Sequence, residues 1–365
     1  MKKTFYILLF LLGVNVFASE EYLKGKIIKE MENIEPQEYE EETLYYKNFL
    51  VEIKNKEKVE EIIISNPIYK ESIHNLHLKK GDRVILYKDY ENSIYYFVDK
   101  IKTKEILILV MIFISLFLIL AKFRGLKSIF SLFSTIIFFL FIIVPMITEG
   151  FSPILAAVLL GVFSTILTFY SIGGFNKKII GALAGTLGGI IVSAILSSIF
   201  VKLMSLTGYV DADAMNYSSL FEGIDLRKLI SAGIIIGSLG AIMDNSVSIS
   251  SALFEVVSHS ENISRKKIFF SGINIGKDVM GTMVNTLVLA YLGSSLFTIM
   301  LFYKQQAEFP LIRILNSEFI VVEILRALCG SIGILVTVPI TSIASAFLLT
   351  RKDVITVEDI DENKL

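Results

Sequence analysis

Long apolar runs fill the sequence from residue 104 onward, and short polar stretches separate them. A helix needs roughly 20 mainly apolar residues to cross a hydrocarbon core of about 30 Å. The pattern therefore predicts membrane-spanning helices. We expect seven, over residues 104–121, 127–147, 152–171, 179–203, 229–257, 278–302 and 319–349.

A different pattern precedes these runs. Between residues 19 and 103, short β-prone segments such as Phe49–Ile53 and Val84–Tyr87 alternate with turn residues, which predicts a small β-rich domain, a β-barrel. Before it, Lys2 and Lys3 introduce an apolar segment that ends near Ala18. Residues 1–18 are typical of a signal peptide, or of a signal anchor if no cleavage occurs.

The chain therefore divides into a leader (1–18), a β-rich domain (19–103), a helical transmembrane domain (104–350) and a tail (351–365). Basic residues favour cytoplasmic loops. If the β-rich domain lies outside, the loops that become cytoplasmic hold most of them, at 122–127, 177–178, 265–267 and 351–352. The predicted fold is an α-helical polytopic membrane protein of about seven transmembrane helices, with a small N-terminal extracytoplasmic β-rich domain and a cytoplasmic C-terminus.

Composition agrees with a membrane protein and removes other classes. The sequence is 53% hydrophobic, its mean hydropathy is +0.65 and its formal net charge is −1. Without a basic excess, we expect no nucleic-acid partner. The single cysteine, Cys329, permits no disulfide within the chain and no thiolate cluster. The three histidines are scattered, so neither a metal site nor a cofactor is expected.

Two polar stripes interrupt the apolar pattern near the centre of the predicted bundle. On a helix, Asp244 and Ser248 share a face with Ser251 and Glu255, and Asp278 shares a second face with Thr282 and Asn285. Asn245 and Asn274 lie beside them. Lipid does not solvate such groups, so the stripes should face the bundle interior or a water-filled cavity. Their side chains either form interhelical hydrogen bonds or line a translocation or binding path.

The segment before the predicted sixth span leaves another choice open. Residues 268–276 are apolar but contain glycines, which indicates a re-entrant segment or an interfacial connector, and it places Asp278 near the membrane edge. At the other side of the membrane, Glu323 and Arg326 share one helical face. They form either a structural ion pair or a gate.

Several of these residues belong to longer motifs. The runs Gly240-Ala-Ile-Met-Asp244 and Ser271-Gly-Ile-Asn274-Ile-Gly276-Lys277-Asp278, followed by Gly281-Thr282 and Asn285-Thr286, resemble the YibE/F family of bacterial membrane proteins. Glu323, Arg326 and Gly330-Ser-Ile-Gly333 continue the resemblance, which covers roughly residues 104–350. It implies a multi-span protein of the bacterial cytoplasmic membrane with an external N-terminal domain. It supplies no function and no residue roles.

Three function classes follow from the chemistry of the chain. The favoured one is a transporter or permease of a small solute or ion, in which intramembrane carboxylates relay protons or cations. The alternative is a membrane-anchored binding, sensory or scaffold protein whose external domain engages a partner. The third is an intramembrane hydrolase that uses two aspartates, but the sequence does not favour an enzyme. The expected partners are the lipid bilayer and the solute, and a homo-oligomer is left open.

Overall fold

The structure is a computed structural model of the whole chain, and its two compact units, Met1–Ile119 and Leu120–Leu365, are described one by one. It describes residues 22–34, 43–55, 58–69, 75, 78–89, 94–174, 176–210, 216, 223–260, 263–304 and 310–350. The predicted leader (1–18) and tail (351–365) lie outside these residues.

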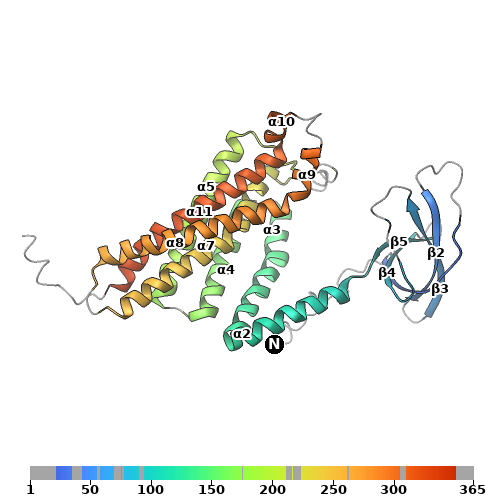
Figure 1. Ribbon diagram of the computed structural model, residues 1–365, viewed down its shortest axis with the longest axis horizontal. Helices are drawn as coiled ribbons and strands as arrows, with labels where there is room; N and C mark the ends of the chain where they lie inside the picture. Colours follow the sequence, from blue (N-terminus) through green and yellow to red (C-terminus); the bar gives the residue numbers. More distant parts are fainter. Residues whose placement is uncertain are drawn as a thin grey trace, which may run out of the picture. The chain divides into compact units, whose positions relative to one another are not determined.

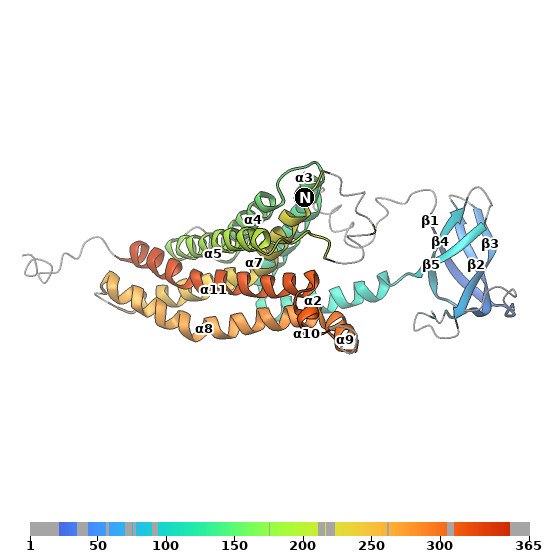
Figure 2. The same cartoon turned by 90° about the horizontal axis from the view of Figure 1, so that it is seen from above.

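The first unit contains a five-stranded sheet in the order β3-β2-β1-β4-β5, in which every neighbouring pair is antiparallel (Figure 2). The strands are β1 (Tyr22–Glu30), β2 (Thr43–Asn55), β3 (Lys58–Tyr69), β4 (Arg83–Asp89) and β5 (Ile94–Lys100).

Alternate residues of these strands build the core of the sheet. Ile27, Phe49, Val51, Val84 and Leu86 are buried together on one face, as the two-residue period of a strand requires. The outermost strands, β3 and β5, also contact each other, so the sheet curls toward the expected barrel. The β-rich character predicted for this region is confirmed.

Long helices build the second unit. The helical elements of the described residues are α2 (Thr103–Phe138), η1 (Phe139–Ile143), α3 (Val144–Thr148), α4 (Pro153–Gly173), α5 (Lys177–Leu203), α7 (Leu226–Ser258), α8 (Arg265–Ser294), α9 (Leu296–Lys304), α10 (Leu311–Leu315) and α11 (Glu318–Leu349). Within the described residues, six helices are long and apolar enough to cross a membrane, or seven if the bent pair α8 and α9 is one span.

The first two predicted spans follow one another along α2, η1 and α3. Lys122 has non-helical backbone angles (φ 49°, ψ −132°) and divides this helical run into Thr103–Phe123 and Gly125–Thr148. This break coincides with the charged residues that separate the two apolar runs in the sequence.

The glycines of residues 268–276 do not interrupt the chain there. This segment lies within α8, which begins at Arg265 and continues to Ser294, and its re-entrant or interfacial placement in the membrane stays a prediction. The chain bends later, by 60° between α8 and α9. Gly272 and Gly276 do not break the helix; they are buried where α8 meets Ser342 and Val338 of α11.

The helices α5, α7, α8 and α11 run side by side along most of their lengths (Figure 1). α11 contacts the other three, and α7 also contacts α4. Small residues allow this close approach, as is usual between membrane helices. A Cβ on Gly189 of α5, for example, would come within 2.9 Å of the Gly333 carbonyl oxygen on α11.

Candidate functional site

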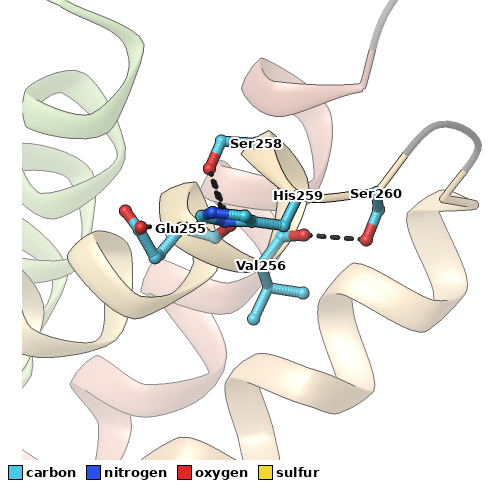
Figure 3. A network of polar contacts seen from close by, with 5 residues as sticks. All are labelled: Glu255, Val256, Ser258, His259 and Ser260. Atoms are coloured by element: carbon cyan, nitrogen blue, oxygen red, sulfur yellow. Dashed lines mark hydrogen bonds and ion pairs between the residues drawn. The ribbon is translucent and has the colours of Figure 1, made fainter.

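The helix α7 carries the first polar stripe and is capped at both ends. At its start, the Asp225 carboxylate accepts hydrogen bonds from the backbone N–H groups of Arg227 (3.1 Å) and Lys228 (3.4 Å). At its end, the Ser258 hydroxyl donates to the Glu255 carbonyl oxygen (2.8 Å), and Ser260 donates to Val256 (Figure 3). The Glu255 carbonyl also accepts from the His259 backbone N–H (3.3 Å), so the side-chain bonds add to the last backbone bonds where α7 ends.

The exposed His259 ring belongs to the same cap. Its Nδ1 atom lies 3.0 Å from the Glu255 carbonyl oxygen and 3.7 Å from the Glu255 carboxylate (Figure 3). All these contacts join residues close together in the sequence. The polar group at the end of α7 is therefore a helix terminus rather than a binding site.

Two contacts fix the relative level of α7 and α8. Near one end of the pair, a Cβ on Gly237 would lie 2.5 Å from the Tyr291 hydroxyl group. Near the other end, a Cβ on Gly272 would lie 2.9 Å from the Leu253 side chain. The helices are antiparallel, so this register sets Asp244 level with Thr282 and Ser248 level with Asp278.

Asp278 lies 13 positions after the start of α8, or about 20 Å along its axis. Asp244 lies 14 positions before the end of α7, or about 21 Å. Both carboxylates therefore lie in the middle of their helices, about one helical turn apart in level.

Both polar stripes lie on the outer face of the helix pair. The exposed residues that form this α7–α8 polar face are Asp244, Ser248, Asn274, Lys277, Asp278, Thr282 and Asn285. Thr282 donates a hydrogen bond to its own helix, at Val279. Among the residues that the structure describes, none forms a hydrogen bond or ion pair with the side chains of the other six.

Asn245 is separate from this face, although it follows Asp244 directly. Its side chain is fully buried, and its Nδ2 atom donates to the Ile334 carbonyl oxygen of α11 at 3.0 Å. Its Oδ1 atom is one of the buried polar atoms without a partner in the described part of the chain. Asn245 thus connects two helices in the bundle core.

The core contains further polar side chains that the sequence did not single out. Ser193 of α5 donates to the Cys329 carbonyl oxygen on α11 (2.8 Å), and Ser250 of α7 donates to Lys178 on α5 (2.6 Å). Each joins two helices through a backbone oxygen. No signal in the sequence distinguishes these serines from those that bond to their own helix.

The predicted pair on α11 forms a second polar cluster. Arg326 Nη1 lies 3.4 Å from Glu323 Oε1, and both side chains are largely buried. The Arg326 guanidinium lies over the Tyr291 ring of α8, 5.7 Å from its centroid. The Tyr291 hydroxyl, Glu323 Oε2 and Arg326 Nε are buried without partners among the described residues. The sequence did not indicate a place for Tyr291 in this cluster. Its hydroxyl group lies against Gly237 of α7.

No cluster of three His, Cys, Asp or Glu side chains that could hold a metal ion occurs in the described part of the chain. The candidate site therefore consists of unpaired carboxylates, amides, one serine hydroxyl and one ammonium group on a helical surface. Such groups bind ions and small polar solutes by charge and hydrogen bonding.

One of three comparisons with known proteins found a match. The profile of the family described as YibE/F-like protein matches residues 109–351. No curated protein and no solved structure matches the chain.

Proposed function

The chain belongs to the YibE/F-like protein family, and from this premise we propose that it is an integral membrane transporter or permease of a small solute or ion. In this proposal the α7–α8 polar face lines the path of the solute. Asp244 and Asp278 relay protons or cations, and Ser248, Asn274 and Asn285 replace part of the hydration shell of the solute. The sheet domain lies outside the cell and the C-terminus lies in the cytoplasm.

The observation that supports this proposal is the exposure of the polar face on helices that are long and apolar enough to span a membrane. A charged side chain at the centre of a membrane helix costs about 2.5–3.5 kcal/mol. Side chains that only hold helices together point inward and are paired, as Asn245 and Ser193 are. Asp244 and Asp278 point outward and have no partner among the described residues, so we infer that a polar environment interrupts the lipid beside them.

The first experiment is a transport assay in vesicles with a panel of ions and amino acids. We expect Asp244→Asn to lower the rate at least roughly tenfold, because the amide keeps the shape of the side chain but carries no charge. Its thermal midpoint should equal that of the wild type, since the structure gives Asp244 no partner to lose.

The matched control is Asp99→Asn. This carboxylate lies in β5 of the sheet unit and pairs with Lys102. Its removal should leave the rate unchanged. If Asp244→Asn and Asp278→Asn both transport normally, the relay is wrong, and the function of a membrane-anchored binding or scaffold protein is favoured instead.

A further inference from the structure

The α8 side of the polar face has the properties of a contact surface. Asn274, Lys277, Asp278, Gly281 and Asn285 are all exposed on this helix. Acid, base and amide groups occur together, so the surface contains hydrogen-bond donors and acceptors and charges of both signs. Lipid tails supply no such groups, and a purely apolar helix would leave all of these side chains unpaired.

We propose that this surface binds a second copy of the same chain, and that the transport path is complete only in the dimer. Two copies inserted in the membrane with the same orientation are related by a twofold axis perpendicular to the membrane. Such an axis places each residue opposite residues of the same depth in the other copy. The second part of the inference rests on the proposed function; the contact itself does not.

The neighbouring charges on α8 fit this symmetry. Lys277 and Asp278 are consecutive and therefore lie at nearly the same depth. Across the axis, Lys277 meets Asp278 of the partner subunit, and Asp278 meets Lys277 of the partner subunit. One contact thus neutralises four charges, and in the dimer the relay of the proposed function rests on Asp244, which stays outside these pairs. Asn274 and Asn285 add amides, which both donate and accept hydrogen bonds.

The backbone also permits a close approach. A Cβ on Gly281 would meet no atom within 4 Å, so the outer side of α8 is open at this position. Gly281 lies between the charged pair and Asn285, within the proposed contact. Asp244 lies on the adjacent helix α7, at nearly the level of Gly281. The second copy therefore provides the missing wall of the path beside Asp244.

Cysteine cross-linking in native membranes tests the contact directly. We would place a cysteine by Gly281→Cys, or by the control Ile191→Cys, in a Cys329→Ser background. Ile191 is exposed on α5 at a similar depth, about 21 Å from the start of that helix. Oxidation should cross-link the Gly281→Cys chain into dimers, at least about fivefold more efficiently than the control. Equal efficiencies, or no dimer in either variant, would overturn the proposal.

A charge exchange tests the reciprocal ion pairs. Lys277→Asp and Asp278→Lys each place like charges across the axis and should raise the dimer dissociation constant at least about tenfold. The double variant restores opposite charges and should return the constant to within about threefold of the wild-type value. The control Lys202→Asp, at the end of α5, should have no effect. Mass photometry in detergent measures all four variants.

These outcomes separate the dimer from the proposed function. If the wild type is a monomer, or if the double variant is as weak as the single variants, the dimer is wrong even where transport still requires Asp244. If the dimer forms and Asp244→Asn transports normally, the transport role of Asp244 is wrong and the contact stands.

Discussion

At the scale of single residues, two neighbours on α7 have opposite environments. One step along a helix turns the side chain by about 100°, so Asp244 faces outward and Asn245 faces the core. The amide has a fixed interhelical partner, whereas the carboxylate has none in the described residues. The structure thus divides the two alternatives for the polar centre between different residues: Asn245 holds helices together, and Asp244 is available for function.

This division predicts different effects of substitution on stability. Asn245→Ala should lower the free energy of unfolding by about 1 kcal/mol, because it removes the bond to Ile334 and leaves a small cavity. Thermal unfolding in detergent measures the loss. Asp244→Asn is the control and should not shift the midpoint. The assignment fails if Asn245→Ala is as stable as the wild type, or if Asp244→Asn is the less stable of the two.

At the scale of elements, glycines mark close contacts both between helices and within the sheet. Gly272 and Gly276 are contact positions inside the continuous helix α8, where larger side chains would overlap α11. In the sheet, Gly25 interrupts the apolar alternation of β1, because a Cβ there would overlap Val51 and lie 3.2 Å from Leu86. Both follow from close packing between elements, which sequence periodicity does not reveal.

The turn before β4 provides a prediction that depends on pH. Partial burial acts to raise the pKa of Asp82, but hydrogen bonds from the Lys100 ammonium and the Lys79 backbone N–H outweigh burial and hold the pKa below 3.8. Because the folded pKa is depressed, this ion pair stabilises the fold above pH 3.8, and the contribution disappears as pH falls through the folded pKa.

Lys100→Met removes the ammonium group and should raise the pKa of Asp82 toward 3.8. At neutral pH it should cost about 1 kcal/mol or less, since the pair is partly exposed. Carboxyl NMR of labelled aspartates in nanodiscs follows the titration. Lys102→Met, which removes the partner of Asp99 instead, is the control and should leave the pKa of Asp82 unchanged. An unchanged Asp82 titration in Lys100→Met would contradict the assignment.

At the scale of the whole molecule, the chain combines a sheet unit that has its own core with a unit of long apolar helices. The orientation of the helices depends on charge rather than on packing. Basic residues cluster at the start of α8 and near Lys122. If the sheet unit lies outside, both of these positions are cytoplasmic.

Cysteine labelling tests this orientation. In a Cys329→Ser background, Lys80→Cys lies in an exposed turn before β4, and Lys266→Cys lies at the exposed start of α8. A membrane-impermeant maleimide should label Lys80→Cys in intact cells and Lys266→Cys only after the membrane is opened. Labelling of Lys266→Cys in intact cells would reverse the predicted topology.

The sequence alone determined the class of the protein and most of its helices. Transmembrane helices can be recognised from the local sequence, because each must be apolar over about 20 residues whatever it packs against. The same holds for the β-rich N-terminal region, whose strands β2 to β5 contain the short apolar runs. The residue types of the candidate site were also visible, since polar groups are rare in such segments.

Only the tertiary structure decided which way those polar residues point. Periodicity showed that Asp244 and Ser248 share a face, but the positions of α5, α8 and α11 made that face the outer one. The tertiary structure also decided that residues 268–276 are helical, since Gly272 and Gly276 pack against α11 and do not break the helix. Both outcomes depend on neighbours distant in the sequence, and a local pattern carries no information about which helix lies on which side.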